Sequence, residues 1–187
     1  MKFIALDIGN VCIRIEPRRA LTTLGLNEAP PELLRATLDF ESGKLGEAEF
    51  MFRASAACGG RFTEKELRNA FRAILIEPMP GMSELVLSLP ARGIQPVFFS
   101  DISVSHLAQV REMFPGALAV PEGVYSFDAG ALKPGEAMFA RFENLYGRPL
   151  RYFDDRPELI AAATERGWRA VRFESADRMA AELAAGL

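Results

Sequence analysis

Three apolar runs in this chain each end in carboxylate or hydroxyl side chains. The runs cover residues 3–6, 96–99 and 150–153, and the polar residues that follow them are Asp7, Ser100, Asp101, Asp154 and Asp155. Carboxylates held close together repel one another, and burial of an unpaired charge is costly. A hard divalent cation removes that conflict, and carboxylate oxygens are ligands that Mg²⁺ takes readily. If the fold brings these residues together, they can form a magnesium site.

The elements that position these residues follow from the hydrophobic pattern. The first two runs lack polar alternation, which predicts strands covered on both faces, as in a parallel sheet. From about residue 80, helical patterns alternate with strand patterns, and a weaker strand pattern occupies residues 169–173. This alternation predicts a doubly wound, Rossmann-like α/β sheet, in which ligands bind at the carboxyl ends of the strands. Asp7, Ser100 and Asp154 would all lie at that edge.

The segment after the first strand breaks the alternation. It contains helical patterns and almost no strand signal, and Thr63 with Glu66 three residues later is a capping-box signature. We therefore expect an α/β core made of residues 1–14 and 80–187. Residues 15–79 would form a small α-helical cap inserted after the first strand.

Two side chains suit a phosphate group at the same edge. The Ser100 hydroxyl and the ammonium of Lys133, which precedes Pro134 in a loop, could hold phosphoryl oxygens. Asp7 would then be free to attack phosphorus as a nucleophile. These residue types favour the hydrolysis of a phosphate ester.

This constellation resembles the haloacid dehalogenase-like (HAD) hydrolase superfamily. Four motifs of that superfamily occur in order along the whole chain, at residues 7–11 (Asp-Ile-Gly-Asn-Val), at Ser100, at Lys133-Pro134 and at residues 153–158. The helical segment between the first two motifs is similar to the small cap of the superfamily. Each motif alone is weak, but four in the same order indicate the superfamily strongly.

The resemblance implies a role for each of these residues. Asp7 would be the nucleophile that forms an aspartyl-phosphate and also a Mg²⁺ ligand, together with the backbone carbonyl of Gly9. Asp154 and Asp155 would complete the metal site, with Asp155 the surer direct ligand. Ser100 and Lys133 would bind the phosphoryl oxygens, and Lys133 would also offset the crowded carboxylates.

Gly9 departs from the common phosphatase pattern, which has a second Asp at this position. That Asp protonates the leaving oxygen and later activates water, and such general acid–base help is typically worth ~10² to 10⁴ in rate. The Asp-x-Gly-Asn-Val form resembles a branch that includes α-D-glucose-1-phosphate phosphatases and the amino-terminal domain of some epoxide hydrolases. As a hypothesis, Asp101 supplies the missing acid–base group, or Glu41 or Lys44 supplies it from the cap.

Two other functions stay open beside the phosphatase. Haloacid dehalogenases also lack the second Asp, but they usually carry Tyr at the position of Gly9. A HAD-like module without catalysis could bind a phosphate compound or a partner. The presence of Asp7, Ser100, Lys133 and Asp155 together argues against that, because loss of activity should spare no particular set.

Composition excludes several function classes. The 187 residues carry a net charge of −3, which argues against binding to nucleic acid or to a membrane surface. No apolar run approaches the ~20 residues that cross a membrane, and because only four apolar residues stand before Asp7 we expect no signal peptide there. Cys12 and Cys58 lie outside any metal-binding spacing, so we expect reduced thiols and a cytoplasmic location. The expected partner is a small phosphate ester, with a sugar phosphate preferred; the oligomeric state is left open.

Overall fold

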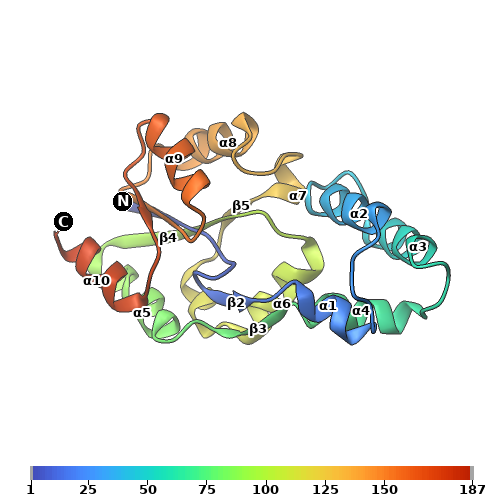
Figure 1. Ribbon diagram of the computed structural model, residues 1–187. Coiled ribbons are helices and arrows are strands. Elements are labelled where there is room, and N and C mark those ends of the chain that lie inside the picture. Colours follow the sequence, from blue (N-terminus) through green and yellow to red (C-terminus); the bar gives the residue numbers. More distant parts are fainter. Residues whose placement is uncertain (1, 186–187) are drawn as a thin grey trace.

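A five-stranded parallel sheet forms the centre of the protein, as the computed structural model of residues 2–185 shows (Figure 1). In spatial order its strands are β5 (Gly123–Tyr125), β4 (Ile94–Ser100), β1 (Lys2–Leu6), β6 (Arg151–Asp154) and β7 (Ala170–Arg172). All neighbouring strands run parallel, and Leu6 of the central strand lies opposite Phe98 on one side and Phe153 on the other. The predicted doubly wound α/β fold is confirmed.

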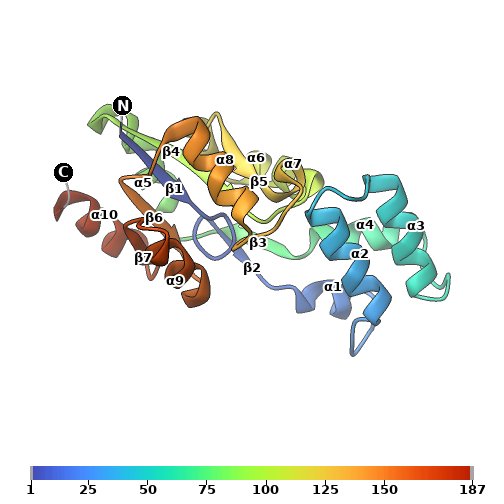
Figure 2. The same cartoon turned by 90° about the horizontal axis from the view of Figure 1, so that it is seen from above.

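Helices cover both faces of this sheet, as Figures 1 and 2 show. One face carries α5 (Met82–Ser88), α6 (Val104–Met113) and α10 (Ala176–Ala185), and the other carries α8 (Glu136–Tyr146) and α9 (Pro157–Glu165). Side chains of the strands alternate between the two hydrophobic clusters: Leu6 and Phe98 belong to the first, and Phe99 belongs to the second. Burial on both faces explains why these runs lack polar alternation.

The cap lies beyond one end of the sheet, on the right of Figure 1. Its helices are α1 (Arg18–Thr23), α2 (Pro31–Glu41), α3 (Glu47–Ala57) and α4 (Glu64–Arg72). They pack around a hydrophobic cluster of their own, in which the rings of Phe40 and Phe50 stack 4.5 Å apart. The capping box at Thr63 is confirmed, because its hydroxyl accepts from the backbone of Glu66 while the Glu66 carboxylate accepts from the backbone of Thr63.

A two-stranded antiparallel ribbon joins the cap to the core. It consists of β2 (Ile13–Ile15), where the chain leaves the core, and β3 (Leu75–Pro78), where the chain returns. The strand β3 falls in the segment that we expected to hold almost no strand signal. It is short and pairs only with β2, so its sequence lacks the apolar run of a central strand. The boundaries of the cap at residues 15 and 79 stay a prediction.

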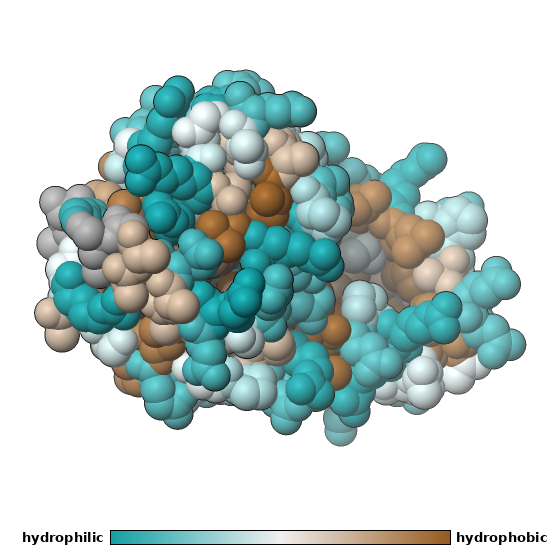
Figure 3. Space-filling model, turned by 60° about the vertical axis from the view of Figure 1, so that its left-hand side comes forward, coloured by the Kyte–Doolittle hydropathy of each residue, from teal (hydrophilic) through white to brown (hydrophobic). Residues whose placement is uncertain are grey.

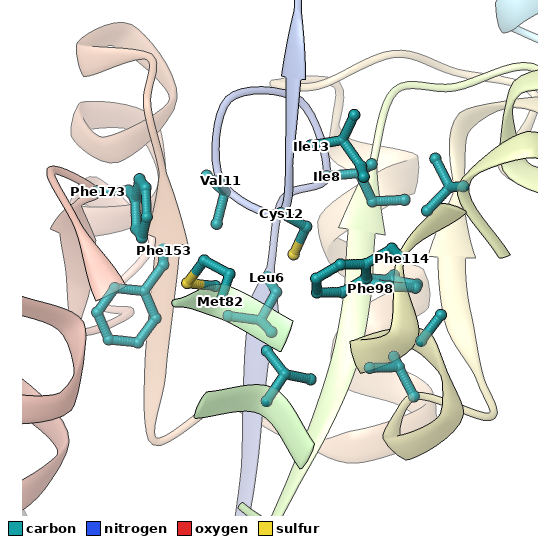
Figure 4. Close-up of a cluster of buried hydrophobic side chains, with 14 of the residues drawn as sticks. Leu6, Ile8, Val11, Cys12, Ile13, Met82, Phe98, Phe114, Phe153 and Phe173 are labelled. Carbon is teal, nitrogen blue, oxygen red and sulfur yellow. The ribbon is translucent and has the colours of Figure 1, made fainter. Parts of the chain in front are cut away.

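The chain between β1 and β2 forms a tight loop that is anchored in the core (Figure 4). The buried side chains of Ile8, Val11 and Cys12 join the hydrophobic cluster on the first face of the sheet. The carbonyl of Ile8 accepts hydrogen bonds from three backbone amides in the loop. Asn10 has a positive φ of 53°, a conformation that Asn tolerates better than most residues. The loop therefore holds Asp7, Gly9 and Asn10 firmly at the edge of the sheet.

The remaining short elements are α7 (Ser126–Ala129) and two 3₁₀ helices, Pro90–Arg92 and Pro115–Ala119. The face of the molecule in Figure 3 is largely hydrophilic, with hydrophobic residues in small areas between the polar ones. Within residues 2–185 no helix has both the length and the apolar character that crossing a membrane requires.

Candidate active site

The ammonium of Lys133 lies between two carboxylates at the carboxyl edge of the sheet. Its Nζ is 2.8 Å from Oδ1 of Asp7 and 2.7 Å from Oδ2 of Asp154. It also donates to the backbone carbonyl of Phe99, at 3.0 Å, and to the hydroxyl of Tyr152, at 3.3 Å. Only 1% of the Lys133 side chain is exposed, so a buried cation with four oxygen partners stands at the centre of the site.

Burial and charge determine the protonation of this cluster. The pKa of Asp7 is raised to about 6, mainly by burial. The charge of Lys133 lowers this pKa, and the charge of Asp154 raises it further. Burial alone would lower the pKa of Lys133, but the nearby carboxylates outweigh it and hold that pKa well above its usual value. Lys133 is therefore charged at neutral pH, and any further positive charge at the site will favour the ionised form of Asp7.

Three carboxylates offer a cation site next to Lys133. One carboxylate oxygen of Asp7, one of Asp154 and one of Asp155 lie within 4.8 Å of one another. Among residues 2–185, no donor makes a hydrogen bond to the backbone carbonyl of Gly9. Hard oxygen donors of this kind fit Mg²⁺ and do not select a softer metal.

The two neighbouring aspartates are held in different ways. Both oxygens of Asp154 are engaged, because Oδ1 accepts from the backbone amide of Arg156, at 2.9 Å, and Oδ2 accepts from Lys133 and Tyr152. Asp155 receives one hydrogen bond, from Nδ2 of Asn10 at 3.1 Å. Asp155 thus keeps an oxygen for a metal ion, and its place as the surer direct ligand stays a prediction.

Ser100 and Asp101 follow β4 at the same edge. Ser100 is 2% exposed, its Oγ lies 3.5 Å from the backbone carbonyl of Asp101, and its hydroxyl helps to lower the pKa of Asp7. Asp101 accepts from the backbone amide of Lys133, at 2.8 Å, and its other oxygen lies 3.9 Å from Nη1 of Arg156. The Asp101 carboxylate therefore holds the loop that carries Lys133.

The two cap residues predicted as alternative acid–base groups lie in different surroundings. Lys44 is exposed and pairs with Asp39 at 3.7 Å. Glu41, the last residue of α2, is half-buried, and its backbone carbonyl accepts a hydrogen bond from Oγ of Ser126 at 2.5 Å. Burial and the charge of Asp101 raise the pKa of Glu41 to about 7.

Sequence reasoning missed three side chains that support the site. Tyr152 bonds to Lys133 and Asp154, Asn10 bonds to Asp155, and Ser126 connects the cap to the core. Asn10 lies within the first motif and Tyr152 directly precedes the fourth, so proximity to the motifs could have identified both residues. Ser126 follows a short strand that the hydrophobic pattern does not reveal.

Comparison with solved structures identifies the fold. A HAD family enzyme from Bacteroides thetaiotaomicron has a TM-score of 0.83 at 19% sequence identity, over 94% of each chain. This chain has the HAD-like fold. A second structure of the B. thetaiotaomicron enzyme, with a TM-score of 0.80 over 94% of this chain and 95% of that one, contains magnesium and inorganic phosphate. The resemblance inferred from the motifs is thus confirmed at the level of the fold.

The HAD-like fold also covers other chemistry. L-2-haloacid dehalogenase from Xanthobacter autotrophicus, solved with covalently bound chloropropionic acid, has a TM-score of 0.67 at 13% identity, over 100% of this chain and 83% of that one. Searches of protein-family models and of curated proteins give no match. The fold alone does not choose between a phosphatase and a dehalogenase, so the choice rests on the site.

Proposed function

We propose that the protein is a Mg²⁺-dependent phosphatase that hydrolyses a small phosphomonoester through a phospho-Asp7 intermediate. The observation that carries this proposal is the position of Lys133 between Asp7 and Asp154, with Asp155 close enough to share a cation with both. A buried ammonium beside a cation site provides positive charge for a doubly negative phosphoryl group. The magnesium and phosphate in the similar structure support the same chemistry.

The residues of the chain have distinct tasks in this reaction. Bound Mg²⁺ would supply positive charge that screens the phosphoryl oxygens from the nucleophile, and Asp7, Asp154, Asp155 and the Gly9 carbonyl would hold it. Oδ of Asp7 attacks phosphorus as the bond to the ester oxygen breaks, and that oxygen takes up a proton and leaves as the alcohol. Lys133 and the Ser100 hydroxyl bind the oxygens of the transferring group and stabilise its charge. Water then attacks the phosphorus of phospho-Asp7, releasing phosphate and restoring the carboxylate.

The cation site favours a phosphatase over a dehalogenase. A 2-haloacid carries a single carboxylate and releases a halide, so its displacement needs no divalent cation. The crowding of Asp7 with Asp154 and Asp155, which such a cation would relieve, has no purpose in that reaction. The cap should exclude water and contact the non-phosphate part of the substrate, and sugar phosphates are the first substrates to test.

The test is phosphate release in the presence of Mg²⁺ from 4-nitrophenyl phosphate and from a panel of sugar and alkyl phosphates. The wild type is compared with Asp7→Asn, which keeps the shape of the side chain but removes the nucleophile. We expect turnover that needs both Mg²⁺ and Asp7. If no ester is hydrolysed while Mg²⁺ and phosphate still stabilise the fold, the protein is a phosphate-binding module instead. Metal-independent halide release from 2-haloacids would indicate a dehalogenase.

A further inference from the structure

Glu41 stands at the junction of cap and core, and two contacts of the backbone hold it there. Oγ of Ser126 donates to the Glu41 carbonyl, at 2.5 Å, and accepts from the backbone amide of Ile102, at 2.9 Å. Two residues further on, a Cβ at Gly43 would come within 2.0 Å of the carbonyl of Phe127, so the turn after α2 fits tightly against α7. The end of α2 is therefore fixed next to α7, and Ser126 joins it to Ile102, which follows β4. Figure 1 shows α7 beside α2.

The surroundings of the Glu41 carboxylate do not favour its charge. It is half-buried, it lies near Asp101, and it is the last residue of α2, where the helix dipole disfavours an anion. Within residues 2–185 it has no ion-pair partner and no hydrogen bond. Stability gives no reason for an acid here, and a titratable group in such a place indicates a functional role.

The two other groups considered for proton transfer are occupied. Burial raises the pKa of Asp101 as well, but this carboxylate accepts from the backbone amide of Lys133, at 2.8 Å, and faces Arg156 at 3.9 Å, and both contacts would weaken if it carried a proton. Lys44 is 66% exposed and pairs with Asp39. Of the three candidates, Glu41 is the one whose side chain has neither a hydrogen bond nor an ion pair within the described part of the chain.

We propose that Glu41 is the general acid and base that takes over the task of the carboxylate absent at Gly9. This inference rests on the proposed phosphatase activity. In the first step the Glu41 carboxyl gives its proton to the ester oxygen as Oδ of Asp7 bonds to phosphorus and the alcohol departs. In the second step the Glu41 carboxylate takes a proton from water as the oxygen of that water bonds to phosphorus and the bond to Asp7 breaks. The two steps leave Glu41 protonated, so the cycle closes.

The acidity of Glu41 suits both steps. Burial and the charge of Asp101 raise the pKa of this side chain to about 7, so both of its forms are populated near neutral pH. Asp101 is the charged group that acts on this pKa, and Arg156 faces Asp101 from the core. The carboxyl can therefore donate a proton in one step and accept one in the next.

The test follows nitrophenolate release from 4-nitrophenyl phosphate on the millisecond scale, in Mg²⁺, for the wild type and Glu41→Gln. Nitrophenolate leaves without a proton, so formation of phospho-Asp7 should keep a rate within about threefold of the wild type. Hydrolysis of phospho-Asp7 needs the base, so we expect a burst of one equivalent followed by a steady state slower by about 10² or more. On any alkyl or sugar phosphate that the wild type hydrolyses, Glu41→Gln should show no burst of alcohol or sugar release, because that leaving group needs a proton.

Control variants separate this role from a structural one. Glu32→Gln changes an exposed glutamate of the same helix and should leave both phases unchanged. Glu41→Asp, which keeps a carboxyl on a shorter side chain, should recover part of the steady-state rate. If Glu41→Gln leaves both phases as they are, or slows burst and steady state equally, Glu41 is not the acid–base group. If the wild type gives no Asp7-dependent release at all, the phosphatase proposal fails, and this inference fails with it.

Discussion

Nε2 of His106 lies 2.9 Å from the backbone carbonyl of Phe71, and the two rings stack with their centroids 3.9 Å apart. His106 belongs to the core helix α6 and Phe71 to the last turn of the cap helix α4. Nε2 of Gln109 donates to the next carbonyl, that of Arg72, at 3.0 Å. Together with the contact between Ser126 and Glu41, these bonds attach the cap to the core at two separate places.

The His106 contact predicts a dependence of stability on pH. Burial lowers the pKa of His106 to about 4, from an unfolded value near 6.5. Between these values the unfolded chain binds a proton that the folded chain does not, so the free energy of unfolding falls as the pH drops from 6.5 towards 4. The slope from this group reaches at most ~1.4 kcal/mol per pH unit. Urea unfolding at pH 7.5, 6 and 5 measures it, and His106→Gln should show a shallower slope; identical slopes would contradict the prediction.

The buried Lys133 predicts a large loss of stability when its charge is removed. Lys133→Met leaves Asp7 and Asp154 close together without a cation, and breaking a buried ion pair in this way typically costs about 3–5 kcal/mol. Denaturant unfolding in metal-free buffer measures the cost. Lys44→Met is the matched control, because its pair with Asp39 is exposed and should contribute less than ~1 kcal/mol. Similar losses of unfolding free energy in both variants would mean that the buried ion pairs contribute no more to stability than an exposed one.

Mg²⁺ should stabilise the folded protein. A ligand that binds only the folded state adds about 2.7 kcal/mol at a concentration one hundred times its Kd. Asp155→Asn removes a charge from the cation site and should shift this stabilisation to higher Mg²⁺ concentrations, as thermal unfolding over a Mg²⁺ series would show. Asp128→Asn changes an exposed aspartate that pairs with Arg141 and should respond to Mg²⁺ like the wild type. An equal response of all three proteins would remove Asp155 from the metal site.

A carboxylate can be introduced at Gly9. The φ of Gly9 is not in the left-handed region, and an added Cβ would meet Cδ1 of Ile15 at 2.9 Å, the end of a flexible side chain. Ile15→Val removes that atom, so Gly9→Asp with Ile15→Val should fold and offer a second acid close to Asp7. In a protein that also carries Glu41→Gln, these two substitutions should raise the turnover of alkyl phosphates about 10²-fold. Gly9→Asn with Ile15→Val is the control without a carboxyl, and equal rates for the two would show that the new acid moves no proton.

Most of the fold could be predicted from the sequence because central strands carry strong signals. The runs that became β1 and β4 are buried on both faces, so their sequences are almost continuously apolar, and the run before Asp154 is interrupted only by Arg151. The edge strand β5 has three residues and was missed, since so short a segment leaves no pattern to detect. The helix α8 begins at Glu136 with Gly135 as its N-cap, so Lys133 and Pro134 stand in the loop before it.

The candidate site could be predicted only in part. Asp7, Ser100 and Asp154 end central strands, and the geometry of a parallel sheet brings such ends together whatever the details of the loops. The position of Glu41 depends on how α2 meets α7, a contact between segments 85 residues apart along the chain. No local pattern encodes that contact, so the sequence could offer Glu41, Lys44 and Asp101 only as alternatives.

The anchored loop after β1 also protects a thiol. Cys12 is fully buried, its Sγ lies 3.4 Å from the backbone carbonyl of Asp7, and burial raises its pKa well above the usual value. A thiol needs access and ionisation to react, so Cys12 stays inert towards alkylating reagents while the loop keeps its place. The rate at which Cys12 is alkylated therefore reports how often the loop that follows Asp7 leaves the core.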